Sequence, residues 1–383
     1  MSWQQRNKRF WGMRLAKRGV LTVMAVLLLL ASGCTGKSAD GGHAGQTGGA
    51  DGAGGGLQDD AGTASGDQTK GGRDGLPETP PEDDSDLPLD EQLASLAETG
   101  APVADLLNFV RMFAGQASPA EMSAMLQILE EKQLEQIFAL EDRFYEEAGI
   151  QEELLNWYVK LERLPKAADL PDGPAKRLLE DTEAGGYKAE TAEGMFFPVI
   201  DYAVYKEFRS RATEDMQAYI DLMAKESDEP AVKDAALVIP WEEVARRALA
   251  CESFVAAYPD SPRAAMADRI RKDYTYITFR GIDNSPLFER EGGPAVEAAL
   301  SAFKKVLETA DGTADSRYLS DLREFVRLIE AGGGRQTDAV RAFQEKVTEG
   351  LLDDYDEQYE NLGRHMDRKG LRGRPFLFSR PLL

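Results

Sequence analysis

Four residues are of the types that most often act as nucleophiles or as bases near neutral pH: Cys34, Cys251, His43 and His365. A Ser-His-Asp or Cys-His site needs an imidazole within hydrogen-bond reach of its nucleophile. Neither histidine falls within the long helical region that we predict below. We therefore expect no site of either kind, and the sequence leaves the catalytic residues unknown.

The motifs of metal and cofactor sites do not occur in the sequence. There is no His-Glu-x-x-His motif, and no closely spaced cysteines offer thiolate ligands. A Gly-x-x-x-x-Gly-Lys-Ser/Thr loop is missing, and no Gly-x-Gly-x-x-Gly follows a strand pattern. We predict no cofactor and no metal.

The 67 aspartates and glutamates leave carboxylate chemistry open. A glycoside hydrolase holds two carboxylates about 5 to 10 Å apart in a cleft. Pairs such as Glu242 with Glu243, or Asp283 with Glu289, have no distinctive surroundings in the sequence. We interpret them as solvated helix faces, and an envelope hydrolase using a carboxylate pair stays as the alternative function.

Cys251 lies in a helical pattern that is rich in apolar residues. A free cysteine commonly packs as a small apolar side chain. We therefore predict a structural, buried role for Cys251 among Trp241, Val244, Ala245, Ala248, Leu249 and Val255.

The first 34 residues have the three parts of a secretory signal. Six basic residues and no acidic ones come first, followed by a 12-residue run, 20–31, that is apolar except for Thr22. This run is too short to span a bilayer, which takes about 20 residues. It leads through Ser32 and Gly33 directly into Cys34.

Residues 30–34 resemble the lipobox of bacterial lipoproteins, with Ala31 at the position where leucine is commonest. The resemblance implies cleavage by signal peptidase II before Cys34, a thioether-linked diacylglycerol on Cys34 and often an amide-linked acyl chain such as palmitate. Two or three acyl chains hold a protein firmly on a membrane. We predict a signal peptide at 1–33 and a lipid anchor at the extracytoplasmic face of the cell membrane.

Removal of residues 1–33 changes the formal net charge from −22 to −28, because the signal carries six basic and no acidic residues. A chain of this charge is repelled by nucleic acid. We expect no nucleic-acid partner. If Cys34 carries lipid, Cys251 has no cysteine left for a disulfide.

The composition of residues 34–88, which is rich in Gly, Asp and Pro, predicts a disordered spacer. Between 35 and 87 there is no Phe, Trp, Tyr, Val, Ile or Met. Such a segment cannot bury enough surface to offset the entropy of ordering. A flexible chain of this length spans on the order of 40 Å, which would hold the body clear of the bilayer.

Residues 89–360 predict an all-α domain of stacked helices, partly solenoid-like or bundle-like, with a candidate sub-boundary at 165–194. Ser118 and Glu121 predict a capping box. Residues 195–200 could be one strand or a buried loop, and we expect a minor β element near 187–199. The predicted helices cover 102–113, 119–148, 152–164, 175–181, 201–211, 213–226, 231–238, 240–257, 262–279, 294–309, 315–331 and 337–352. The pattern at 119–148 fits one long helix or two in tandem.

Residues 247–261, with Ala250, Phe254 and Pro259, resemble the second helix of a tetratricopeptide repeat. No second copy follows at a spacing near 34 residues, and a solenoid needs about three repeats. The region 187–288 is also similar to uncharacterised helical lipoproteins of Gram-positive spore-formers. That resemblance implies a Gram-positive membrane and no particular activity.

Residues 361–383 form a basic tail, in which Asp367 is the only acidic residue from Arg364 onward. Apolar residues such as Phe376 and Phe378 are interleaved. We predict a contact with anionic lipid or a phosphate-rich wall polymer; docking on the acidic body and a free terminus are the alternatives. The candidate polyanion contacts are Arg364, Arg368, Lys369, Arg372, Arg374 and Arg380.

Taken together, these patterns predict a lipid-anchored extracytoplasmic helical protein. We expect it to be a non-catalytic binding or scaffold protein of the cell envelope, with the membrane and an envelope protein or wall polymer as partners.

Overall fold

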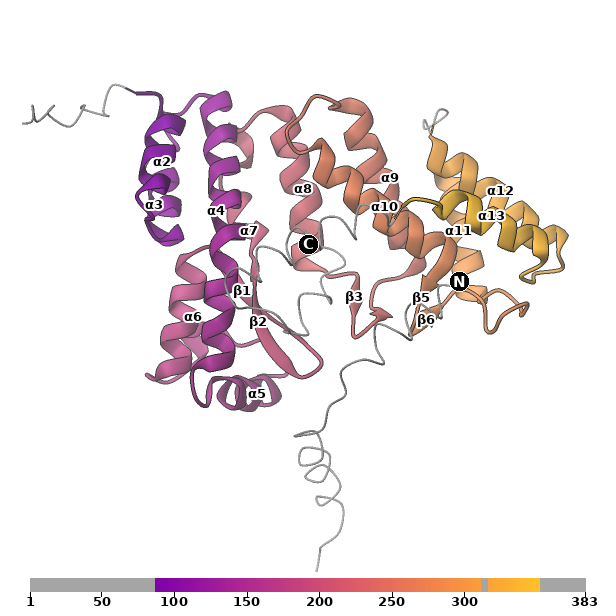
Figure 1. Cartoon of the computed structure of the whole chain (residues 1–383), viewed down its shortest axis with the longest axis horizontal. Helices are drawn as coiled ribbons and strands as arrows, with labels where there is room; N and C mark the ends of the chain where they lie inside the picture. Colours follow the sequence, from indigo (N-terminus) through magenta and orange to yellow (C-terminus); the bar gives the residue numbers. More distant parts are fainter. Residues whose placement is uncertain (1–86, 311–315, 352–383) are drawn as a thin grey trace, which may run out of the picture. The chain divides into compact units, whose positions relative to one another are not determined.

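The computed structural model describes residues 87–310 and 316–351. Of these residues, 65% are helical and 9% are in strands, so the predicted all-α class is confirmed (Figure 1). The described strands form three separate two-stranded antiparallel hairpins. Among the described helices, none is long and apolar enough to cross a membrane.

The first three helices are α2 (Leu89–Glu98), α3 (Val103–Phe113) and α4 (Pro119–Glu146), and both α2 and α3 pack against α4. The predicted capping box is present at the start of α4. Glu121 N donates to the Ser118 hydroxyl at 3.3 Å, and Ser118 N donates to the Glu121 carboxylate at 2.9 Å. That carboxylate also accepts from Leu89 N at 3.2 Å, so one side chain fixes the starts of two helices.

The next elements are α5 (Ile150–Leu161), α6 (Pro174–Ala184) and the hairpin of β1 (Tyr187–Ala192) and β2 (Met195–Ile200). They share a small core with the end of α4. That core consists of Phe144, Ile150, Leu154, Ala167, Leu170, Ala175, Leu178, Leu179, Ala189 and Phe196.

Residues 195–200 are therefore a strand. Pro198 pairs with Ala189, and it is tolerated because a two-stranded sheet has no central strand. The connecting residues Glu193 and Gly194 both have positive φ, 51° and 77°, as a tight two-residue hairpin turn requires.

The remaining helices form groups of two, two and three that are separated by β-hairpins. The elements are α7 (Tyr202–Tyr205), α8 (Glu214–Asp228), β3 (Val232–Lys233), β4 (Ala236–Leu237), α9 (Trp241–Ala257), α10 (Ala264–Arg280), β5 (Gly281–Ile282), β6 (Ser285–Pro286), α11 (Glu297–Thr309), α12 (Arg317–Ala331) and α13 (Asp338–Thr348).

The helix predicted at 231–238 is wrong, because this segment is the β3–β4 hairpin. Asp234 and Ala235 have φ of 52° and 55°, which no right-handed helix contains. Pro230 directly before the segment and the β-branched Val232 and Val238 also favour an extended chain. The predicted helix at 201–211 is only α7 and a 3₁₀ turn, Arg209–Arg211.

The three hairpins are linked to one another at their turns. Glu193 N in the first hairpin donates to the Asp234 carboxylate in the second at 2.6 Å. Asn284 in the third donates from its backbone N to Ala235 O at 2.9 Å and from its side chain to Asp234 O at 2.7 Å. These hydrogen bonds connect the turns of three hairpins that lie about 45 residues apart in sequence.

A single larger core joins the first helices to the last ones. It contains Leu106 and Met125 from the N-terminal helices together with Ile220, Tyr274 and Phe325 from later ones, all fully buried. This core and the linked hairpins hold the residues of the site described next.

Candidate functional site

The most specific residues predicted from the sequence lie outside the described residues. These are Cys34, His43, His365 and the six basic residues of the tail, Arg364, Arg368, Lys369, Arg372, Arg374 and Arg380.

Cys251 is described, and it is buried in α9 with 1% of its surface exposed. Burial, together with the negative charge of Glu226, raises the pKa of the Cys251 thiol to about 12. Since the thiolate is the nucleophilic form, this thiol is inert near neutral pH. The predicted structural role agrees with this environment.

The carboxylate pairs considered from the sequence do not form acid–base pairs. Glu242 contacts Arg246 at 2.6 Å and Lys305 at 2.7 Å, and these contacts lower the pKa of Glu242. Glu243 instead forms ion pairs with Arg247 at 3.1 Å and with Lys225 at 3.4 Å. Asp283 and Glu289 are both exposed, as solvated carboxylates would be.

One buried carboxylate, Glu130 of α4, is held by groups from three other segments. It accepts hydrogen bonds from the Tyr202 and Tyr219 hydroxyls, the latter at 2.7 Å. Arg263 forms an ion pair with it at 2.7 Å and lies over the Tyr219 ring, 5.4 Å from its centroid. Burial and the charge of Glu130 raise the pKa of both tyrosines well above the usual range.

A second buried carboxylate, Glu226 of α8, has a similar environment. It accepts from the Tyr274 hydroxyl at 2.5 Å and from Arg247 at 3.1 Å, and Glu226 and Arg247 are each 4% exposed. Arg247 also donates to the Tyr274 hydroxyl at 3.0 Å and to Glu229 O at 2.9 Å. Burial raises the pKa of Glu226, while Arg247 opposes that shift.

These two clusters fix helices in place. Glu130 is satisfied by two tyrosine hydroxyls and Arg263, and Glu226 by one tyrosine hydroxyl and Arg247, as a buried charge requires. Neither cluster was predicted from the sequence, although a signal existed. Glu130 follows Leu126 by four residues and Glu226 follows Met223 by three, so both fall on the apolar faces of their helices.

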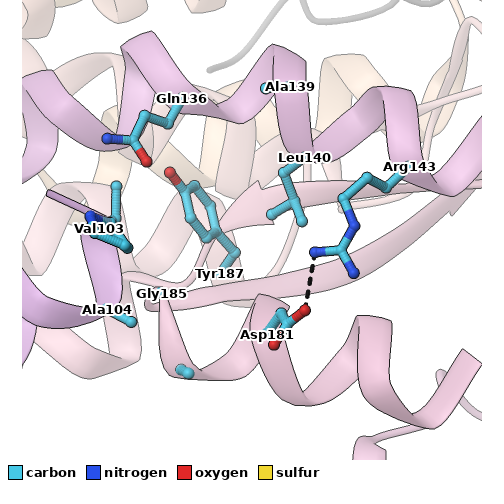
Figure 2. A pocket seen from close by; sticks show the side chains of 11 residues that line it. Val103, Ala104, Gln136, Ala139, Leu140, Arg143, Asp181, Gly185 and Tyr187 are labelled. Carbon is cyan, nitrogen blue, oxygen red and sulfur yellow. Dashed lines mark hydrogen bonds and ion pairs between the residues drawn. The ribbon is translucent and has the colours of Figure 1, made fainter. Parts of the chain in front are cut away.

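A surface hollow of about 500 Å³ lies between α3, α4, α6 and β1 (Figure 2). Its lining is mainly apolar, and Tyr187 closes one side with its hydroxyl donating to Gln133 O at 2.8 Å. The lining residues are Pro102, Val103, Ala104, Gln136, Ala139, Leu140, Arg143, Asp181, Ala184, Gly185 and Tyr187.

Few polar groups line the hollow. Gln136 donates to Ala101 O at 3.2 Å. Arg143 donates to Asp181 at 2.9 Å (Figure 2). It also donates to Glu147 at 2.9 Å. Neither Glu130 nor Glu226 lines the hollow. A hollow of this size and composition can receive an apolar group with a charged flank.

Within residues 87–310 and 316–351, no group of three or more His, Cys, Asp or Glu residues is arranged to hold a metal ion. The sequence did not predict the hollow, because its walls come from residues about 80 positions apart.

No protein-family model matches this chain, and no curated protein or solved structure is similar to it at a significant level.

Proposed function

We propose that this chain is a lipid-anchored extracytoplasmic protein that binds a partner in the cell envelope and does not act as an enzyme. The anchor is the lipid on Cys34 that the lipobox resemblance implies. The spacer behind it gives the helical body room to reach partners above the bilayer.

The hollow between α3, α4 and α6 is the observation that carries the binding role. A mainly apolar depression between packed helices is a common way to receive a side chain or a helix from a partner. Its volume of about 500 Å³ falls within the range of ligand sites.

The alternative function, a hydrolase with a carboxylate pair, finds less support. A general acid or nucleophile must reach its substrate in a cleft. Two of the buried carboxylates, Glu130 and Glu226, are 2% and 4% exposed and already engage tyrosine and arginine partners. Such groups fix the helices relative to one another.

The basic tail supplies a second contact in this proposal. Its six cationic residues, 364–380, suit an anionic lipid or a phosphate-rich wall polymer. Together, the lipid, the hollow and the tail would hold the protein at the envelope and bring a partner to it.

The binding role is tested by capture from envelope fractions with the full chain. Ala139→Arg places a long cation in the hollow at an exposed helical position. Ala298→Arg makes the same change at an exposed position of α11 and serves as a matched control. We expect a reproducible partner with the wild type and the control, and about tenfold less with Ala139→Arg. Equal capture by all three proteins would contradict a binding role for the hollow.

A further inference from the structure

The hollow exists because several of its wall residues are too small to fill it. Ala104 of α3, Ala139 of α4 and Ala184 of α6 all line it, and Val103, Leu140 and Tyr187 contribute apolar surface. A group that entered would bury apolar surface on both sides at about 25 cal/mol per Å².

Acidic residues that line the hollow or adjoin its lining residues in sequence are here called the acidic rim. Asp181 lines the hollow and is paired with Arg143 at 2.9 Å. Asp105 follows the lining residue Ala104 directly and is exposed. On α4, Glu135 and Asp142 lie four residues before and three after Ala139, a spacing that places them on the same flank of the helix. Glu135 is paired with Lys132 at 2.8 Å.

This acidity extends across the N-terminal half of the described chain. Residues 87–200 contain 22 Asp and Glu against nine Lys and Arg. In the hollow, the one cation among the lining residues, Arg143, is already bonded to Asp181 and Glu147. An occupant is therefore favoured if it is apolar and carries positive charge.

One segment of the chain has this composition. Residues 374–383 contain Arg374 and Arg380 with no acidic residue, and they carry Phe376, Leu377, Phe378, Leu382 and Leu383. The 32 residues that follow Leu351 could extend to about 110 Å, which is ample reach for any surface of the body.

We infer that the C-terminal segment 374–383 binds in this hollow of its own chain, with its apolar side chains on the floor and its arginines against the acidic rim. The segment then occupies the surface that receives the envelope partner, so the contact is autoinhibitory. An arginine held at the rim is also not free for a polyanion, and the two contacts compete. The autoinhibitory role rests on the proposed function, because it requires a partner that binds the same hollow; the contact of 374–383 with the hollow does not.

The direct test is photo-crosslinking in the full chain, expressed in cells, with a benzoylphenylalanine in place of Phe376. We expect crosslinks within one chain to residues 136–143 and 181–187. Crosslinks confined to other segments would overturn the inference. A product of the size of two chains would also overturn it, since a second copy would then supply the segment.

Two variants sharpen this test. Ala139→Arg should lower the crosslink yield about tenfold, and Ala298→Arg should leave it unchanged. Arg374→Glu with Arg380→Glu changes only the tail, so it reports on charge pairing even if Ala139→Arg disturbs the fold. We expect about a tenfold loss there too, and an unchanged yield would contradict the role of the acidic rim. In Arg374→Glu with Arg380→Glu, loss of the crosslink should also raise partner capture, because the hollow is then free for the partner. Unchanged capture would contradict the autoinhibitory role. A retained crosslink in the wild type with no partner captured by any variant would contradict the proposed function alone.

Discussion

Arg247 donates a hydrogen bond of 3.1 Å to the carboxylate of Glu226, and both side chains are only 4% exposed. Glu226 belongs to α8 and Arg247 to α9, and the Tyr274 hydroxyl of α10 bonds to both of them. One buried ion pair therefore connects three consecutive helices. This ion pair adds little to the free energy of unfolding, because the cost of desolvating the two charges offsets much of their attraction. Its main effect is to fix how the three helices are placed relative to one another.

This arrangement predicts strong coupling between the two residues. Arg247→Met leaves the Glu226 carboxylate buried with Tyr274 as its remaining hydrogen-bond donor, and it should lower the free energy of unfolding by about 3–5 kcal/mol. The double variant Glu226→Gln with Arg247→Met should lose much less than the sum of the two single variants. Urea unfolding followed by circular dichroism measures each value.

The control for this cycle lies on the same helix. Arg246 is exposed and pairs with Glu242, so Arg246→Met should change the free energy of unfolding by at most about 1 kcal/mol. If Arg247→Met cost no more than Arg246→Met, the buried pair would not be holding the three helices.

The buried thiol predicts a pH-dependent difference between folded and unfolded chains. Burial raises the pKa of Cys251 from 9.0 to about 12, so at pH 8 the folded chain carries on the order of a thousandfold less thiolate than the unfolded one. In a Cys34→Ala chain, Cys251 is the single thiol. Iodoacetamide should modify it rapidly in urea and very slowly in the native protein.

The raised pKa of Cys251 also determines whether a rise in pH stabilises or destabilises the folded chain. Between pH 9 and 12 the unfolded chain has lost a proton that the folded chain keeps, so the Cys251 contribution favours unfolding increasingly as the pH rises. A Cys251→Ser chain should lack most of this dependence. Fast native alkylation at pH 8 would show that the thiol is accessible.

The β3–β4 turn predicts a stabilising substitution. Ala235 has a φ of 55°, a region that costs a non-glycine residue about 1–2 kcal/mol. Ala235→Gly should raise the free energy of unfolding by about 0.5–1 kcal/mol, after the extra freedom of glycine in the unfolded chain is counted. Ala236→Gly, one residue later in β4, should instead destabilise, and thermal unfolding compares the two. A loss of stability from Ala235→Gly would contradict this turn geometry.

Local patterns in the sequence were sufficient for most of the helices. The capping box at Ser118 and Glu121 and the apolar spacing of α4 depend on residues close together in the chain, so they could be predicted. The β3–β4 hairpin could not, because its two-residue strands are too short to show an alternating pattern. Its turn is stabilised by Glu193 and Asn284, which are about 40 to 50 residues away.

The candidate site was less predictable than the fold. The hollow depends on α3, α4 and α6 packing together, and no local pattern reports a space between three helices. The burial of Cys251 could be predicted from its apolar neighbours. Glu130 and Glu226 each lie on the apolar face of a helix, and each is paired with an arginine from another helix or loop. A charged residue on an apolar helix face could therefore have been used to predict such a pair.

The central claim is that Cys34 carries the lipid that places this protein at the membrane, and mass spectrometry of the N-terminal peptide of the membrane-extracted protein tests it most directly. We predict an N-terminus at Cys34 with the added mass of a diacylglyceryl group, and loss of membrane association in Cys34→Ala. A peptide that retains residues 1–33, or a mature chain with an unmodified Cys34 thiol, would contradict the account.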